Sequence, residues 1–421
     1  MLNRAVAPNF KEIDRVVIQE VQKETLSNGI PMFYLNSGTE EVIRLELVFQ
    51  AGKYYENQSG LNLLMAATIG EGTKSFDSKT IRNTFDRYGV FWSAKSGYDL
   101  FSFQFYLMAK HLDKVLPIIQ ELITSATFPE EEVEIVKEIK KQEIQLNNSK
   151  TNVVSSQLFK EKLFGSEHPY GRRISEENIA TLNSTDLINY YKQTISKNTF
   201  EIFLCGKIEV DTMKLISEEL GSLVIDKQDL SSETKEVVSL KSEYIPWKDA
   251  LQTSISMGNI TLQKGDKDYY SLLFTTILLG GYFGSRLMKN VREEKGLTYG
   301  IHASIKHLAR HSYFSIHADV MKEKLGEAQE AIKEELEKIA YEPIPEDELQ
   351  TVKNYITGSF LTSLNTPFSL MDTFTSLYFH GQDYNFIQNY IKHLRQIDST
   401  EVNRIANTYL KPSAMIEVSV G

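Results

Sequence analysis

Hydrophobic and polar residues follow the same order in the two halves of the chain. Each half begins with a strand-like segment, 44–52 and 252–258, that leads into an apolar helical segment, 60–69 and 269–279. A second helical segment and two strand-like segments follow in each half; they are residues 78–90, 90–97 and 101–108 in the first half and residues 285–297, 297–305 and 313–320 in the second. This agreement over successive elements indicates an internal duplication.

Glycine and proline positions support the duplication. Gly89 and Gly296 are 207 residues apart (296 − 89), and each follows a helical segment at a position typical of a left-handed C-cap. Pro129 and Pro345 are 216 residues apart (345 − 129), and each precedes acidic residues where a helix is expected to begin. The separation grows along the chain, as loop insertions would produce.

Long charged segments complete each half. Residues 111–125 and 321–339 carry apolar residues near i, i+3, i+4 and i+7, which is typical of amphipathic helices. We therefore predict an α+β fold of two homologous α/β halves, each with a mixed, mostly antiparallel sheet and helices packed on one face. The predicted limits are 1–225 and 244–421, joined by a polar linker at 226–243 that lacks a clear apolar period.

Composition and charge narrow the class of protein. The 421 residues include 46 Lys+Arg and 56 Asp+Glu, and the net charge of −10 argues against a dedicated nucleic-acid binder. Cys205 is the only cysteine, which excludes an internal disulfide bond and a cysteine-based zinc site. No segment reaches the roughly 20 apolar residues of a membrane span, and the first residues lack the apolar core of a signal peptide. We therefore expect a cytoplasmic protein with no membrane and no nucleic-acid partner.

The histidines offer few candidate metal sites. His307 and His311 have the four-residue spacing that two ligands on one helix would need, but they lie between two strand-like segments. We expect a hairpin connection with two solvated histidines there, with metal binding as the alternative. His168 lies alone in a polar turn, where a structural or solvated role is expected. The sequence contains no P-loop, no dinucleotide-binding glycine fingerprint and no G-x-S-x-G motif.

One polar pair could carry chemistry. Arg292 lies near the end of a helical segment, and Tyr299 follows seven residues later at the start of a strand-like segment. A guanidinium and a phenolic hydroxyl are hydrogen-bond donors that together could hold a peptide carbonyl, or the oxyanion formed when water attacks it. The competing interpretation is structural, with a charge at a helix C-terminus and a half-buried strand tyrosine.

Several motifs resemble those of the pitrilysin/insulinase family of zinc peptidases. They are LSNGIPMFY at 26–34, GLNLLMAATIGEGT at 60–73, HPYGRRI at 168–174 and GGYFGSRLMKNVREEKGLTYGIHA at 280–303. The resemblance covers nearly the whole chain and is to the short-chain branch that includes mitochondrial processing peptidase and bacterial two-subunit homologues. It implies that each chain has two similar halves and that two chains enclose a cavity.

The resemblance implies roles for residues in the second half. Arg292 and Tyr299 match an arginine and a tyrosine seven residues apart in the family's second half, which implies that they are catalytic. Gly280, Gly281 and Gly284 match the position of the family's glycine-rich loop, which implies substrate binding. No Lys-Ser/Thr follows these glycines, so they do not predict a phosphate-binding loop.

The first half departs from the family. Active members carry H-x-x-E-H on the first helix, where two histidines bind zinc and the glutamate is the general base. Leu63, Ala66 and Ala67 stand at those positions in this chain. Glu143 matches the family's third ligand, 76 residues further on (143 − 67). One carboxylate cannot make a zinc site, which needs about three protein ligands, so we expect no metal ligand and no cofactor in this chain.

The resemblance therefore implies the non-catalytic subunit of a heterodimeric zinc metallopeptidase. Such a subunit binds peptide substrate and supplies Arg292 and Tyr299 to a partner that carries H-x-x-E-H and the zinc. In isolation, the chain could pair with a second copy of itself. The alternative is a catalytically silent structural or interaction protein of the same fold. An independently active zinc enzyme with an unusual site is a third hypothesis.

Overall fold

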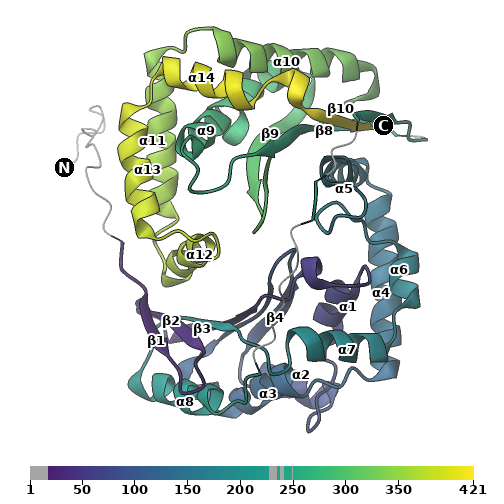
Figure 1. The fold of residues 1–421 in the computed structure, drawn as a ribbon, viewed down its shortest axis with the longest axis vertical. Coiled ribbons are helices and arrows are strands. Elements are labelled where there is room, and N and C mark those ends of the chain that lie inside the picture. The colour runs from purple at the N-terminus through teal and green to yellow at the C-terminus, as the bar shows by residue number, and fades with distance from the viewer. Residues whose placement is uncertain (1–17, 227–234, 238–240, 249) are drawn as a thin grey trace, which may run out of the picture.

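Two β-sheets, one from each half of the sequence, form the framework of the molecule (Figure 1). The computed structural model describes residues 18–226, 235–237, 241–248 and 250–421. The first sheet consists of β1 (Gln22–Thr25), β2 (Pro31–Asn36), β3 (Val42–Phe49), β4 (Phe91–Ser96), β5 (Phe101–Met108) and β6 (Glu201–Gly206). The second consists of β7 (Glu243–Ile245), β8 (Gln252–Thr261), β9 (Thr298–His307), β10 (Ser312–Met321) and β11 (Ile416–Val420).

Both sheets combine parallel and antiparallel pairs. The first is ordered β1-β2-β6-β3-β5-β4 and the second β7-β11-β8-β10-β9. The pairs β2–β6 and β7–β11 are parallel, and the other strand pairs in the described residues are antiparallel. The predicted α+β fold, with mixed and mostly antiparallel sheets, is therefore confirmed.

Among the described residues, the first half contains eight α-helices and the second half six. The first half has α1 (Leu61–Thr68), α2 (Ser78–Arg87), α3 (Leu112–Thr124), α4 (Glu130–Asn148), α5 (Thr151–Phe164), α6 (Glu176–Thr181), α7 (Ser184–Thr194) and α8 (Val210–Gly221). The second has α9 (Tyr269–Thr276), α10 (Leu325–Tyr341), α11 (Glu346–Thr362), α12 (Pro367–Tyr378), α13 (Tyr384–Gln396) and α14 (Ser399–Tyr409). In the position of α2, the second half has a π-helical segment, Met288–Glu294.

The turn residues singled out in the sequence have the expected backbone. Gly89 and Gly296 have φ angles of 63° and 62°, in the left-handed region that favours glycine. Pro129 and Pro345 are the N-caps of α4 and α11, and acidic residues fill the first turn of each helix. These carboxylates lie near the positive ends of the helix dipoles, which stabilises both helices.

The helical segment predicted at 269–279 changes its geometry before it ends. The α-helical part, α9, ends at Thr276, and the chain continues as a π-helical turn, Ile277–Gly281. This turn brings Gly280 against β9, where a Cβ on Gly280 would lie only 2.7 Å from the Cβ of Ala303. A side chain would therefore not fit between the turn and the strand.

Side chains alternate between the two faces of each sheet, as a period of two requires. On β3, Ile43, Leu45 and Leu47 belong to the main core of the first half, together with residues of α1 and α3. Val48 of the same strand belongs to a separate apolar cluster on the opposite face. The helices that follow β3 in sequence therefore cover one face, and another element must cover the other.

The other face of each sheet is covered by a helix from the other half. On the first sheet, Met371 of α12 packs with Phe33 and Phe203. On the second sheet, Ser155 of α5 donates hydrogen bonds to the Ser256 hydroxyl, at 2.8 Å, and to a main-chain carbonyl of β11, at 3.2 Å. Figure 1 shows α12 and α5 between the two sheets, at opposite sides of the molecule.

This exchange of helices bears on the domain limits. The limits at 225 and 244 stay a prediction. They divide the sequence into two halves, but α5 and α12 each pack on the sheet of the other half. Most of the predicted linker, 226–243, lies outside the described residues. In the described part of the chain, no helix combines the length and apolar character needed to cross a bilayer.

Candidate functional site

α1 presents the positions of the missing zinc ligands on its half-buried face. Leu64 and Met65 are fully buried in the core of the first half. Leu63, Ala66 and Ala67 are half-buried, and Leu63 lines a cavity of about 300 Å³. The three side chains offer neither a metal ligand nor a general base.

The position of the family's third zinc ligand is also unsuitable. Glu143 of α4 has a side chain that is 53% exposed, and its Oε2 lies 2.8 Å from the ammonium of Lys140. Among the residues that the structure describes, no three histidine, cysteine, aspartate or glutamate side chains form a group that could hold a metal ion. The residues present therefore do not fit the family's zinc ion.

The segment that holds His307 and His311 is a hairpin connection, as predicted. The Leu308 amide donates to the His311 carbonyl at 2.9 Å, and the strands β9 and β10 flank the turn. The expectation that both histidines are solvated is wrong, because both are half-buried. The His307 ring nitrogens lie 2.8 Å from the Tyr269 hydroxyl and 2.9 Å from the Ser312 hydroxyl, and burial lowers the pKa of His307 to about 3. The His311 Nε2 is buried, and the ring centroids of His311 and Phe164 are 6.0 Å apart.

His168 has a structural position. It is 3% exposed, and its Nδ1 accepts a hydrogen bond from the Tyr170 amide at 3.1 Å. Its ring stacks on the ring of Phe164, with centroids 5.4 Å apart. Burial, followed by the nearby His311, lowers the pKa of His168 to about 4. The side chain is therefore a neutral, packed part of the core near neutral pH.

Arg292 and Tyr299 come from two adjoining elements of the second half. Arg292 belongs to the π-helical segment Met288–Glu294, and its guanidinium carbon lies 4.7 Å from the ring centroid of Phe283. Tyr299 belongs to β9 and is 90% exposed. The interpretation of Tyr299 as a half-buried strand residue is therefore wrong, and its hydroxyl is accessible to a bound molecule.

The three glycines of the candidate substrate loop are explained in part by packing. Besides Gly280, which lies against β9, a Cβ on Gly284 would lie 2.9 Å from the ring of Tyr282. A Cβ on Gly281 would lie 3.1 Å from the side chain of Ile277, a tight contact. These glycines therefore allow the chain to turn closely, and their substrate-binding role stays a prediction.

Two cavities adjoin along α5, which no pattern in the sequence had indicated. The first is the cavity beside Leu63, and the second, of about 490 Å³, lies against the second sheet and is lined by Gly300 of β9. Gln157 and Lys160 of α5 line both cavities. The degenerate zinc position and the strand that carries Tyr299 therefore border adjoining spaces within one chain.

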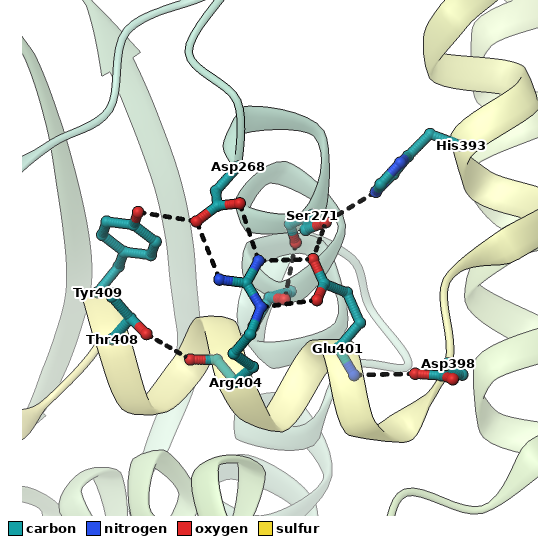
Figure 2. A network of polar contacts seen from close by, with 9 residues as sticks. Asp268, Ser271, His393, Asp398, Glu401, Arg404, Thr408 and Tyr409 are labelled. Carbon is teal, nitrogen blue, oxygen red and sulfur yellow. Dashed lines mark hydrogen bonds and ion pairs between the residues drawn. The ribbon is translucent and has the colours of Figure 1, made fainter.

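A serine, a histidine and a glutamate also meet in the second half (Figure 2). Ser271 Oγ lies 2.7 Å from both His393 Nε2 and Glu401 Oε1. In a serine hydrolase the histidine lies between the serine and the carboxylate, whereas here Ser271 lies between His393 and Glu401. Ser271 is also only 1% exposed, so this cluster does not have the arrangement of a catalytic triad. Arg404 binds both Glu401 and Asp268 at 2.8 Å, so the cluster joins α9, α13 and α14 as a structural network.

Comparisons with known proteins agree with this architecture. The family model described as "Insulinase (Peptidase family M16)" matches residues 32–173, and that described as "Peptidase M16 inactive domain" matches residues 181–356. The "Uncharacterized zinc protease YmxG" of Bacillus subtilis is 23% identical over 355 residues, which are 83% of this chain and 86% of that protein. The "Non-peptidase homolog YmxG" of Helicobacter pylori is 22% identical over 384 residues, 89% of this chain and 88% of the relative.

Solved structures show the same fold. The crystal structure of a peptidase M16 inactive domain from Pseudomonas fluorescens superposes with a TM-score of 0.84 at 20% identity, covering 96% of this chain and 98% of that chain. The two family models match successive parts of the sequence, and both describe peptidase family M16. This chain therefore belongs to the insulinase, or pitrilysin, family of peptidases, and it lacks the zinc-binding side chains of that family on α1.

Proposed function

We propose that this chain is the non-catalytic, peptide-binding subunit of a heterodimeric zinc metallopeptidase. The partner subunit carries H-x-x-E-H and supplies the metal. The observation that carries the proposal is the contrast between the two halves. Positions 63, 66 and 67 have lost every metal-binding side chain, whereas Arg292 and Tyr299 are retained and Tyr299 is 90% exposed.

Arg292 and Tyr299 are suited to stabilise charge on a peptide carbonyl oxygen. Both side chains donate hydrogen bonds, and the arginine also carries a positive charge. Donors that meet the oxyanion of a tetrahedral intermediate lower the barrier to peptide hydrolysis. The ring of Phe283 lies against the Arg292 guanidinium and would hold it in place by a cation–π contact. The turn at Gly280, Gly281 and Gly284 precedes this pair and would contact the peptide.

The proposal is tested in the complex with the zinc-bearing partner. The partner is to be sought as a chain of similar length, with H-x-x-E-H, encoded by an adjacent reading frame. We expect the isolated chain to contain no zinc and to cleave no peptide. In the complex, Arg292→Ala or Tyr299→Phe should lower kcat by about 10²-fold, as the loss of an oxyanion donor does in other enzymes.

Two substitutions serve as matched controls. Lys289→Ala removes an exposed cation from the same π-helical segment, and Tyr341→Phe removes the hydroxyl of a tyrosine that is 70% exposed on α10. Both controls should leave kcat unchanged. Full activity of Arg292→Ala and Tyr299→Phe would exclude the proposed catalytic role.

A second candidate function is that of a catalytically silent structural protein. The observation that favours it is the name of the Helicobacter pylori relative, a non-peptidase homolog. Co-purification with a partner that lacks H-x-x-E-H, or only as a homodimer without peptidase activity, would favour this function. A stoichiometric zinc ion in the purified isolated chain would instead favour an independent enzyme with an unusual site. The cytoplasmic location is likewise a prediction.

A further inference from the structure

Four cations line the cavity beside Leu63, and one of them, Arg173, pairs with Glu161 at 3.8 Å. The other three are Lys53, in the short helical turn Lys53–Tyr55; Lys160, on α5; and Arg172, in the turn that follows α5. In the described part of the chain, none of the three has a carboxylate oxygen within 4.0 Å.

The hydrogen-bond partners of these cations are neutral oxygens. Lys53 donates to the main-chain carbonyl of Arg172, and Lys160 donates to the Tyr98 hydroxyl at 2.8 Å. Arg172 donates from one terminal nitrogen to the main-chain carbonyl of Glu56 at 3.4 Å. The Nε of Arg172 is buried and has no hydrogen-bond partner among the described residues.

The carboxylate in the cavity wall is already engaged. Glu56 is 6% exposed, and its two oxygens accept hydrogen bonds from the amides of Gly60, at 3.3 Å, and Asn62, at 3.1 Å. It therefore caps the N-terminus of α1. One carboxylate used in this way does not balance the three cations, so the cavity keeps an excess of positive charge.

This excess is energetically unfavourable without a bound anion. Burial, followed by Lys160 and Arg172, lowers the pKa of Lys53 to about 8, while Glu56 opposes the shift. Like charges that are gathered out of water repel each other and lose hydration. Such a cost at a cavity is typical of a binding site, where a ligand supplies the missing counter-charge.

The rest of the cavity wall indicates the kind of anion. The volume of about 300 Å³ suits a small group, and Leu63, Ile144 and Ile174 form an apolar part of the wall. The side-chain oxygen of Asn62 is buried without a hydrogen-bond donor among the described residues. A ligand that suits this cavity thus combines an anion, an apolar body and an N–H donor, and the last residue of a peptide has all three.

We propose that this cavity binds the C-terminal carboxylate of a peptide. Lys53, Lys160 and Arg172 hold the carboxylate, the terminal amide N–H faces Asn62, and the last side chain packs on the apolar wall. The inference rests on the proposed function of the chain as a peptide-binding subunit. It adds that the peptide is recognised by its free end, next to the position of the missing zinc ligands.

Calorimetric titration of the isolated full-length chain at pH 7 tests this site. The probes are N-acetylated Ala-Leu-Ala as the free acid and as the C-terminal amide, with inorganic phosphate as a competitor. We expect the free acid to bind at least about tenfold more tightly than the amide, since a charged hydrogen bond is lost in the amide. Lys160→Met and Arg172→Met should each weaken the free acid about tenfold and leave the amide unchanged.

Lys162→Met is the matched control. Lys162 lies on α5 two residues from Lys160, and both lysines are half-buried. Lys162 pairs with Glu243 at 2.6 Å, and neither residue lines the cavity. This variant should bind the free acid like the wild type. If Arg172→Met does not fold, the Lys160→Met result decides alone, because Tyr98 is the one hydrogen-bond partner of the Lys160 ammonium among the described residues.

Three results would overturn the inference. They are equal affinity for the acid and the amide, no binding of either peptide, and binding of phosphate without the free-acid peptide. The titration uses this chain without a partner and leaves Arg292 and Tyr299 intact. A negative titration would therefore not contradict the proposed function, which is tested separately by the peptidase activity of the complex.

Discussion

Many of the predictions from the sequence concern the backbone or the chemistry of single residues. The left-handed backbone at Gly89 and Gly296 was predictable because only glycine adopts it without steric cost. The loss of metal-binding chemistry at Leu63 is equally direct, since side-chain chemistry is a property of the residue. The state of a histidine is different, because it depends on neighbours that lie far away in the sequence. His168 lies in a polar turn of the sequence and is 3% exposed in the fold.

The burial of His168 predicts a loss of stability in acid. Its pKa is about 4 in the folded chain and near 6.5 when it is unfolded, so between these values the unfolded chain binds more protons. The free energy of unfolding should therefore fall as the pH drops from 6.5 to 4, by about 3 kcal/mol from this residue. Urea denaturation of the wild type and of His168→Gln across this range measures the difference. Parallel curves for the two proteins would contradict the prediction.

At the scale of elements, periodicity and caps predicted the strands β3, β4, β5, β8, β9 and β10 and helices such as α1, α3, α4, α10 and α11. The sequence also indicated the antiparallel hairpin β9–β10. It predicted neither α5 nor α12, and it could not indicate where they pack, because periodicity shows that a helix has an apolar face and does not name its partner. Phe159 of α5 shows the result, since it is fully buried in a cluster with Val418 and Val420 of the second sheet.

The packing of α5 predicts a large effect of Phe159→Ala. The substitution removes a buried ring between α5 and the second sheet and should lower the free energy of unfolding by about 3–5 kcal/mol. Ile135→Ala on α4 is the comparison, because Ile135 is 57% exposed and should change stability by no more than about 0.5 kcal/mol. Urea denaturation of both variants provides the measurement. Similar losses in both would show that α5 contributes little to this contact.

At the scale of the whole molecule, the exchanged helices join the two halves. The first half also holds the second through Asp99, which accepts hydrogen bonds from the Ala309 amide at 3.0 Å and from Arg310 at 3.3 Å. Arg44, which is 1% exposed on β3, pairs with Asp372 of α12 at 2.6 Å. Contacts on both sides of the molecule thus make each half part of the other's core.

These contacts predict that neither half folds alone. A fragment of residues 1–225 lacks α12 and would expose Phe33 and Phe203, which are buried in the full chain. We expect this fragment to bind a hydrophobic dye and to unfold without a cooperative transition, whereas the full chain unfolds in one transition. Co-expression with residues 226–421 should restore cooperative unfolding. A cooperative transition of the 1–225 fragment by itself would contradict this expectation.

The sequence by itself determined the repeated order of elements, the helix starts after Pro129 and Pro345 and the loss of the zinc ligands, because these depend on local periodicity, backbone freedom and side-chain chemistry. Only the tertiary structure decided that Tyr299 is exposed, that His307 is half-buried and hydrogen-bonded, and that α5 and α12 pack on the sheet of the other half. It alone brought Lys53, Lys160 and Arg172 to one cavity. Lys53 and Arg172 are more than 100 positions apart in the sequence, and no local pattern links the three residues. Their meeting depends on long-range packing, which burial of the two cores imposes on the chain.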